Sequence, residues 1–217
     1  RGKDAHLRIY EAFKNGEADI LVGTQMIAKG LDFANVTLVG VVSADSSLYI
    51  PDYRSPEKTF QLLEQVAGRA GRKDPGKVVV QTYSPDHYAV EFARRHDFAA
   101  FFNEEMRVRR EALLPPYSVF FRFVFTGKDE KIVRDACLNF AEGLKAEFAD
   151  IRKDILLLDA DEAPISRIQG RVRWHILIKV LNDERLAQFR KRLYIYTDTK
   201  SYKDCAFGME INPQSMI

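Results

Sequence analysis

Three short, continuous apolar runs constrain the fold of the first part of the chain: Asp19–Thr24, Val36–Ser43 and Lys77–Tyr83. Apolar runs without polar alternation are typical of strands that are buried on both faces of a parallel sheet. A helical pattern precedes the first run, and a second one, from Ser55 to about Ala70, precedes the last. Strands that alternate with helices in this way predict an α/β layer with right-handed crossover connections.

The pattern changes after residue 86. Residues 87–116 read as a helical connector that ends at Pro115-Pro116, because proline cannot continue a helix. Residues 117–217 follow the order β-α-β-β-α-β, which is typical of an α+β split βαβ, or ferredoxin-like, domain. We therefore expect an α/β part in residues 1–86, the connector in 87–116 and a second domain in 117–217. In that domain we expect strands at 117–126, 155–160, 167–181 and 204–211, and helices at 129–150 and 183–193.

The charge balance and the cysteine count exclude several classes of protein. The 217 residues include 33 Lys and Arg against 31 Asp and Glu, a net charge of +2, so a nucleic-acid partner would have to meet a local basic patch. Cys137 and Cys205 are too few for a zinc site or a disulfide framework, and we expect both to be buried. No run approaches the roughly 18 apolar residues of a membrane helix, and we expect a cytoplasmic monomer with no membrane partner. The chain begins at Arg1, inside a helical pattern, which we interpret as part of a longer protein.

The octapeptide QVAGRAGR, from Gln65 to Arg72, is the segment best suited to chemistry. Arg69 and Arg72 are three residues apart at a helix end, so we expect both side chains on the same side. A guanidinium keeps its charge and offers several donors in fixed geometry, which suits the developing charge of a transferred phosphoryl group. The glycines would let a ligand approach closely. Alone, the segment could also be a helix terminus with two solvated arginines.

A second segment, GTQMIAKGLDF, spans Gly23–Phe33 directly after the first predicted strand. Parallel sheets place ligand contacts at the carboxyl ends of their strands, where this loop is expected. Thr24 offers a hydroxyl to a phosphate, while Gly30 and Asp32 lie in the predicted turn. Alone, this segment could be a plain strand-to-helix connection.

Together, the two segments resemble motifs V and VI of the second RecA-like lobe of superfamily 2 helicases. Within that superfamily, ILVGTQMIAKGLDF, IPDYRSPEKTFQLLEQVAGRAGR and APISRIQGRVRWHILIK resemble the replication-restart helicases, and the resemblance covers essentially all of the chain. It implies that residues 1–86 are part of such a lobe, a parallel sheet with flanking helices.

The resemblance also implies roles for individual residues. Arg69 and Arg72 match arginines that reach the γ-phosphate of ATP bound to the other lobe, and Arg72 is the stronger candidate for the arginine finger. Gln65 matches the residue that links this helix to the nucleotide site. Thr24 matches a position that touches the DNA backbone. Two positions match those that couple the nucleotide state to the grip on DNA: Gly30 and Asp32.

Cofactors and partners follow from the same resemblance. The intact protein would use ATP and Mg²⁺, and its zinc would be held by paired cysteines upstream of Arg1. It would restart stalled replication in the bacterial cytoplasm, with branched and single-stranded DNA, primosome proteins and single-strand-binding proteins as partners. The chain contains neither a GxxxxGKS/T phosphate loop nor a DExH-like acidic pair, so we expect no ATP hydrolysis by this chain alone. The alternative is a non-catalytic DNA-binding or protein-docking module.

The second domain carries a basic strand. Residues 163–182 include no acidic side chain, and four basic residues are candidate DNA contacts: Arg167, Arg171, Arg173 and Lys179. Successive side chains of a strand alternate between its faces, so Arg171 and Arg173 are expected opposite Val172 and Trp174. The helices of a split βαβ fold cover one face only, which would leave the basic face open to phosphates. The alternative is a charged face that only keeps the domain soluble.

Two remaining features suggest no chemistry. The 4 histidines have no catalytic or metal-binding constellation around them, and we expect them to be structural or exposed. The loop Pro51–Arg54 belongs to the family pattern, but its residues predict only a turn.

Overall fold

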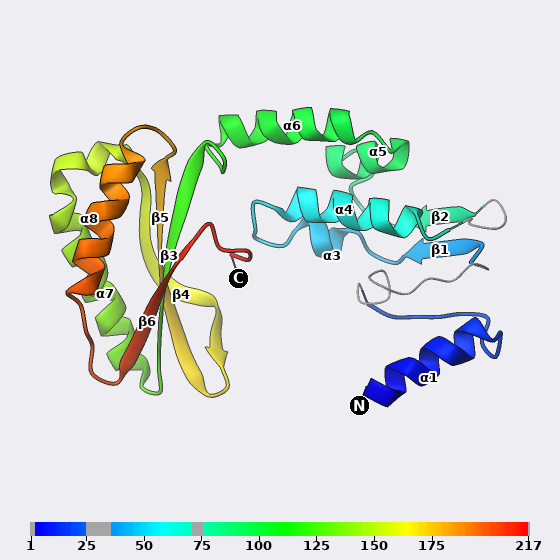
Figure 1. Ribbon diagram of the computed structural model, residues 1–217, viewed down its shortest axis with the longest axis horizontal. Coiled ribbons are helices and arrows are strands. Elements are labelled where there is room, and N and C mark those ends of the chain that lie inside the picture. Colours follow the sequence, from blue (N-terminus) through cyan, green and yellow to red (C-terminus); the bar gives the residue numbers. More distant parts are fainter. Residues whose placement is uncertain (1–2, 25–35, 71–75, 217) are drawn as a thin grey trace. The chain divides into compact units, whose positions relative to one another are not determined.

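The computed structural model describes residues 3–24, 36–70 and 76–216 (Figure 1). The chain divides into two compact units. The first comprises Arg1–Ile50 and Arg54–Glu105, and the second comprises Pro51–Tyr53 and Met106–Ile217. In the described residues, no helix is long and apolar enough to span a membrane.

The first unit contains a pair of parallel strands. β1 (Leu38–Val41) and β2 (Lys77–Val80) pair in register, residue for residue. The helices in its described residues are α1 (Lys3–Lys14), α3 (Asp45–Leu48), α4 (Ser55–Ala67), α5 (Tyr88–Arg95) and the first part of α6 (Phe98–Glu111). The two parallel strands with α4 between them confirm the predicted α/β order for this region. The short helix α3 has no counterpart in the predicted elements.

The prediction of a strand at Asp19–Thr24 is wrong. Residues 20–24 have no regular secondary structure, and Ile20 and Val22 are 79% and 85% exposed. A continuous apolar run becomes a buried strand only where neighbouring elements cover it. In the described residues, the parallel sheet consists of β1 and β2 alone.

The predicted helical connector contains two helices, α5 and α6. His96 follows α5 in the left-handed conformation, with φ 55°, and ends it. The Asp97 carboxylate then accepts a hydrogen bond from the Ala100 N–H at 2.8 Å, as an N-cap residue does at the start of a helix. The core of the first unit is made of buried residues from α3 to α6: Leu48, Phe60, Leu63, Ala89, Val90, Ala93 and Phe101.

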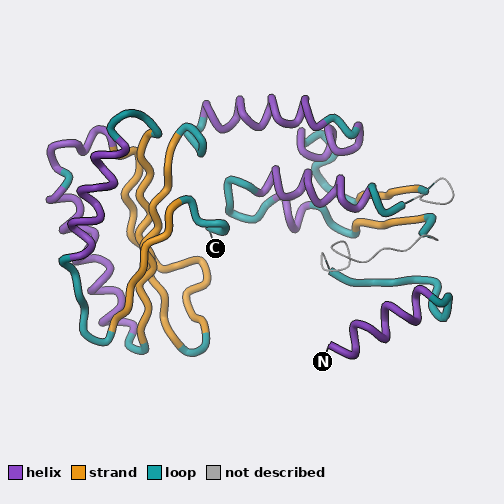
Figure 2. Tube along the Cα trace, viewed as in Figure 1, coloured by secondary structure: helices purple, strands orange, loops and turns teal. Residues whose placement is uncertain are grey.

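The second unit confirms the predicted β-α-β-β-α-β order. Its strands form one antiparallel sheet in the order β4-β5-β3-β6, and the helices α7 and α8 lie on one side of it (Figures 1 and 2). The elements are β3 (Ser118–Gly127), α7 (Glu130–Glu147), the 3-10 helix η1 (Ala149–Asp154), β4 (Ile155–Ile168), β5 (Arg171–Leu181), α8 (Leu186–Asp198) and β6 (Cys205–Ile211).

The single strand predicted at 167–181 is two strands joined by a tight turn. Gln169 and Gly170 have φ values of 49° and 76°. A two-residue hairpin with both φ values positive matches the twist of the flanking strands. As a result Arg167 belongs to β4, and β5 begins at Arg171.

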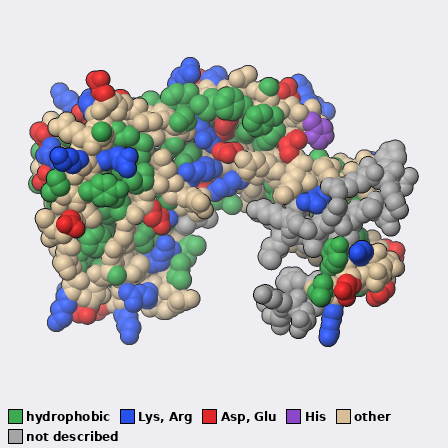
Figure 3. Space-filling view, in the orientation of Figure 1, with side chains coloured by type: hydrophobic (Ala, Val, Ile, Leu, Met, Phe, Trp, Pro, Cys, Tyr) green, Lys and Arg blue, Asp and Glu red, His purple; other side chains and the backbone are tan. Residues whose placement is uncertain are grey.

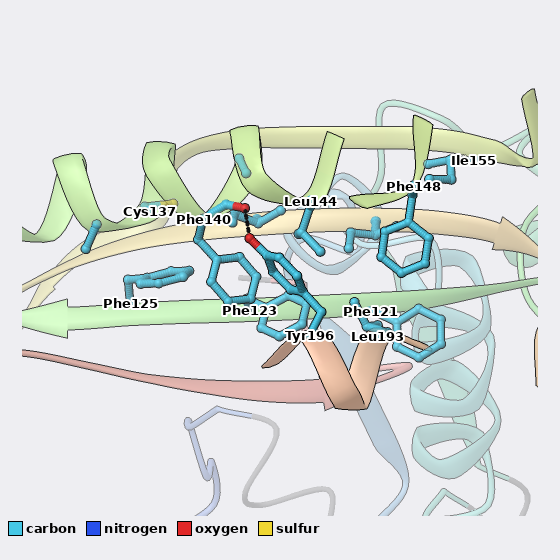
Figure 4. Packing of buried hydrophobic residues seen from close by; sticks show 14 of the residues in the cluster. Phe121, Phe123, Phe125, Cys137, Phe140, Leu144, Phe148, Ile155, Leu193 and Tyr196 are labelled. Carbon is cyan, nitrogen blue, oxygen red and sulfur yellow. Dashed lines mark hydrogen bonds between the residues drawn. The ribbon is translucent and has the colours of Figure 1, made fainter. Parts of the chain in front are cut away.

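The core of the second unit lies between the sheet and its helices. Phe121, Phe123 and Phe125 alternate along β3 and are fully buried, and they pack with residues of α7 and α8 (Figure 4). The Tyr196 hydroxyl in α8 donates a hydrogen bond to the Phe140 carbonyl of α7 at 3.1 Å. The two cysteines are buried as expected: Cys137 and Cys205. Burial raises the pKa of the Cys137 thiol to about 12, which keeps it protonated.

Candidate functional site

Helix α4 carries the beginning of the QVAGRAGR segment, and its first two turns are firmly held. The Ser55 hydroxyl donates to the Ile50 carbonyl at 2.7 Å, and the Thr59 hydroxyl donates to the Ser47 hydroxyl of α3 at 3.1 Å. Ser55 and Thr59 are both buried. A proline in the first turn also favours the helical backbone there. These contacts fix the start of α4 and thereby the direction of the helix towards its opposite end.

The opposite end of α4 presents two of the candidate residues. Gln65 and Arg69 are half-buried, and the Arg69 N–H donates to the Val66 carbonyl at 3.0 Å in a turn that follows the helix. Gly68 between them has φ −68°, and its N–H donates to the Glu64 carbonyl. Among the described atoms, a Cβ at Gly68 would meet only ordinary contacts, and the nearest is the Glu64 carbonyl oxygen at 3.7 Å. The described backbone therefore does not itself require glycine at this position.

The other candidates of the first unit are placed only in part. Thr24 is exposed in a segment without regular secondary structure. Gly30, Asp32 and Arg72 lie outside the described residues, so the structure brings Gln65 and Arg69 to one helix end without describing their partner arginine.

Sequence reasoning missed Asp45, which organises the carboxyl end of β2. Its carboxylate accepts hydrogen bonds from the Tyr83 N–H at 3.1 Å and from the Thr82 hydroxyl at 3.0 Å. Asp45 lies in the first turn of α3, which follows β1. Its hydrogen bonds therefore link the segment after β1 to the segment after β2. An acidic residue in a helix's first turn is a signal that could have indicated this role.

The basic face of the second unit has the predicted alternation. Val172, Ile176, Ile178 and Val180 of β5 are buried, and Trp174 packs against the same core. The residues that alternate with them face away from α7 and α8: Arg171, Arg173, His175, Leu177 and Lys179. On that open face, Arg171 donates to the Thr126 carbonyl at 3.3 Å and Arg173 to the Ile165 carbonyl at 3.2 Å. A guanidinium has five N–H donors, so one such bond orients each side chain and leaves donors for a phosphate.

Lys179 makes more structural contacts than Arg171 or Arg173. Its ammonium donates to the Ala112 carbonyl, just after α6, at 2.8 Å and lies 5.8 Å from the centre of the Phe120 ring. Burial lowers its pKa. Lys179 therefore packs the sheet against the end of α6, which makes it a less accessible contact for DNA than the two arginines.

Arg167 lies on the opposite face from Arg171 and Arg173. It pairs in register with Val172, and cross-strand partners share a face, so its side chain lies on the helix side. There it forms an ion pair with Glu130, in the first turn of α7, at 3.3 Å. The turn at residues 169 and 170 separates it from the basic strand.

The open face of the sheet also carries acidic side chains, which the sequence of β5 alone does not indicate. Asp159 and Asp161 of β4 pair with Leu177 and His175 of β5, and Glu210 of β6 pairs with Arg122 of β3. Arg122 is 7% exposed, and its guanidinium forms an ion pair with Glu210 at 2.7 Å. Figure 3 shows basic, acidic and hydrophobic side chains interspersed on this unit.

Of the histidines, three have described side chains with structural surroundings. His87 caps α5, since its Nδ1 accepts a hydrogen bond from the Ala89 N–H at 3.2 Å, and burial lowers its pKa. His96 contacts Glu64 at 3.1 Å. The pKa of His175 is lowered by burial and by the nearby Arg122 guanidinium. These surroundings agree with the expected structural role.

Comparison with known proteins first defines the class. Residues 2–74 match the helicase conserved C-terminal domain, and residues 110–214 match the primosomal protein N C-terminal domain. The chain is 44% identical to replication restart protein PriA of Bacillus subtilis over 99% of its length, 42% identical to that of Synechocystis sp. over 82%, and 37% identical to that of Borreliella burgdorferi over 76%.

These matches define a chain that is similar to the C-terminal part of replication restart proteins. The chain belongs to the replication restart protein PriA family. It covers 27%, 21% and 25% of these three relatives, so it spans about a quarter of their length.

Proposed function

We propose that the protein to which this chain belongs is an ATP-dependent DNA helicase. It would recognise and remodel stalled replication forks in the bacterial cytoplasm and promote primosome assembly there. The observation that carries the proposal is the placement of Gln65 and Arg69 at one end of α4, whose other end is held by Ser55 and Thr59. The family membership of the chain supports it.

The chain would contribute electrostatic stabilisation rather than a complete site. When bound by the intact protein together with Mg²⁺, ATP supplies the phosphoryl group that is transferred to water. Arg69, and Arg72 in the undescribed segment, would place guanidinium donors on the oxygens where negative charge develops. Gln65 would hold the end of α4 at the nucleotide. The fit is partial, because the chain has donors for phosphate oxygens but no phosphate loop.

Nucleic acid would be held by both units. Thr24, with Gly30 and Asp32 in the same segment, would contact the backbone of single-stranded DNA and respond to the nucleotide. Arg171 and Arg173 would add phosphate contacts from the open face of the second unit, with Lys179 and Arg167 contributing less because of the structural contacts they already make. Primosome and single-strand-binding proteins would be further partners, and zinc would be bound by a segment upstream of this chain.

The test is ATP hydrolysis by the full-length protein that carries Arg69→Ala. Removal of an arginine of this kind lowers turnover by roughly 10³-fold or more, so we expect near-complete loss of DNA-stimulated hydrolysis with little change in DNA affinity. Arg95→Ala, an exposed arginine of α5 paired with Glu91, is the matched control and should retain activity. Normal turnover in Arg69→Ala and in the double variant with Arg72→Ala would contradict the proposal. If Arg171→Ala with Arg173→Ala then still abolished DNA binding, the non-catalytic DNA-binding module would be the correct function.

A further inference from the structure

The short loop Pro51–Tyr53 belongs to a different unit from the residues on either side of it. The chain leaves the first unit after Ile50, contributes three residues to the second unit, and returns at Arg54. The loop thus interrupts the first unit immediately before α4, the helix that carries Gln65 and leads to Arg69.

The tip of this loop is held by a stack of aromatic and cationic side chains within the second unit. The Tyr53 ring stacks on the Phe120 ring of β3, with 5.7 Å between centroids and 28° between planes. The Arg109 guanidinium of α6 lies 5.4 Å from the Tyr53 centroid, and the Lys179 ammonium lies 5.8 Å from the Phe120 centroid. Cations over aromatic faces add attraction to the stacking. Tyr53 is therefore held between a helix and the open face of the sheet.

The neighbouring Asp52 is held as well. It is 7% exposed, and its carboxylate accepts a hydrogen bond from the Met216 N–H at 3.4 Å. The segment that leads to Met216 is itself fixed at Phe120. There, the Asn212 side chain accepts from the Phe120 N–H at 2.9 Å, and the Asn212 N–H donates to the Phe120 carbonyl at 2.8 Å. Phe120 is thus the common attachment of the loop and of the C-terminal segment.

The base of the loop is closed by α4. The Ser55 hydroxyl binds the Ile50 carbonyl, so the chain leaves and returns at one point, and the Lys58 N–H donates to the Arg54 carbonyl at 2.8 Å. Three extended residues span at most about 10 Å, so the loop has little slack to absorb a movement of its tip. A helix of 13 residues is about 20 Å long and moves as a body, which carries a displacement at Ser55 to Arg69.

We propose that Tyr53 is a positioning residue that couples the open face of the second unit to the orientation of α4. Phe120 and Lys179 lie on the same face as Arg171 and Arg173, so DNA bound to that face would act on the stack that holds Tyr53. A displacement of Tyr53 would then move α4 and, with it, Arg69 at the far end of the helix. The inference rests on the proposed function, since it assigns Tyr53 a part in the response of ATP hydrolysis to DNA.

The experiment compares Tyr53→Ala with Tyr53→Phe in the full-length protein. Coupling between sites typically changes an affinity or rate by roughly 5- to 150-fold. We therefore expect Tyr53→Ala to lose at least about tenfold of the stimulation of ATP hydrolysis by DNA, with basal hydrolysis and DNA affinity retained. Tyr53→Phe keeps the stacking ring and should retain the stimulation. Arg109→Gln, which removes the stacked cation together with the hydrogen bond of Arg109 to the Pro115 carbonyl, should give an intermediate loss and replaces Tyr53→Ala if that variant does not fold.

Hydrogen exchange of the amides in residues 55–67 provides a readout independent of hydrolysis. In the wild-type protein, added fork DNA should change the exchange of these amides, and Tyr53→Ala should abolish that change. Wild-type stimulation in both Tyr53→Ala and Arg109→Gln, or an unaltered exchange response, would overturn the inference. A wild-type protein that lacks DNA-stimulated hydrolysis but shows the Tyr53-dependent exchange response would instead overturn the proposed function and leave the coupling standing.

Discussion

The Tyr196 hydroxyl of α8 lies directly against Gly143 of α7, in the position that a side chain at residue 143 would occupy. Tyr196 is held there by its hydrogen bond to the Phe140 carbonyl. The two helices can therefore approach as they do only because residue 143 has no Cβ.

Gly143→Ala should destabilise the protein despite the better helix propensity of alanine. The propensity gain is about 1 kcal/mol, whereas overpacking of a well-packed core costs about 1–3 kcal/mol. Urea unfolding of the whole chain should show a net loss. Gly208→Ala in β6, where an added Cβ meets no atom within 4 Å, is the control and should have a small effect. In a Tyr196→Phe background, which removes the oxygen in closest contact, Gly143→Ala should cost less. An equal cost in both backgrounds would argue against the clash.

The ion pair between the buried Arg122 and the half-exposed Glu210 predicts a loss of stability when Glu210 is removed. Glu210→Ala leaves the Arg122 guanidinium buried with its charge uncompensated, and a hydrogen bond to a charged group is worth about 1.5–3 kcal/mol. Arg134→Ala, which breaks the exposed pair with Asp135, should cost below about 1 kcal/mol. Denaturant unfolding of both variants measures the difference, and equal losses would contradict the prediction.

His87 predicts a loss of stability on acidification. Its folded-state pKa lies below the ordinary value, because burial disfavours the charged ring, so the unfolded chain takes up a proton first. The stability that His87 contributes is complete above its unfolded pKa, about 6.5, and is lost as the pH falls below that value. Asn at this position can cap α5 without titrating. The difference in unfolding free energy between wild type and His87→Asn should therefore shift in favour of the variant from pH 7.5 to 5.5. A difference that does not vary with pH would contradict it.

Arg171 and Arg173 predict a change in the salt dependence of DNA binding. Each phosphate contact contributes about 0.9 to the slope of log affinity against log salt for duplex DNA. Replacement of both by Ala should therefore lower the slope by about 1–2. Arg190→Ala, an exposed arginine of α8 on the other side of the sheet, is the control and should leave the slope unchanged. A fluorescence titration across several salt concentrations measures both.

Gly68→Ala is predicted to affect stability and ATP turnover differently. Its helical φ and open surroundings predict that Gly68→Ala keeps or slightly raises stability, by up to about 1 kcal/mol. If a ligand approaches the backbone there, the added methyl group should still lower DNA-stimulated ATP turnover of the full-length protein by roughly tenfold or more. Thermal unfolding and turnover, measured on the same variant, check the prediction. Unchanged turnover would contradict a close approach of a ligand to the backbone at Gly68.

The sequence predicted best where local pattern and environment agree. The alternation of β5 placed Val172 and Arg173 on opposite faces, and the structure confirms this because one face of the strand meets α7 and the other does not. Likewise, the apolar run around Leu38–Val41 is a parallel strand because β2 pairs with it. Ile20 and Val22 have the same kind of pattern but no strand partner in the described residues. The burial expected on both faces of the strand is not found even in β1, where Leu38 is 61% exposed.

The features that were missed depend on tertiary contacts or on single backbone angles. The left-handed φ values at Gln169 and Gly170 turned one predicted strand into a hairpin and moved Arg167 to the opposite face. The role of Tyr53 depends on Phe120, which is 67 positions further along the chain, and no local pattern relates the two. For the same reason, the acidic partners of the basic face came from β4 and β6 rather than from the basic strand itself.

The three-residue loop at Pro51–Tyr53 also limits how the molecule can be divided. A cut within α6 would yield a C-terminal piece from which the Tyr53 ring is missing, and Phe120, a buried aromatic residue of β3, would lose the ring stacked on it. No single cleavage of the polypeptide separates the two units as continuous segments. The C-terminal unit is therefore complete only when it is made together with Pro51–Tyr53, the residues that precede α4 in the chain.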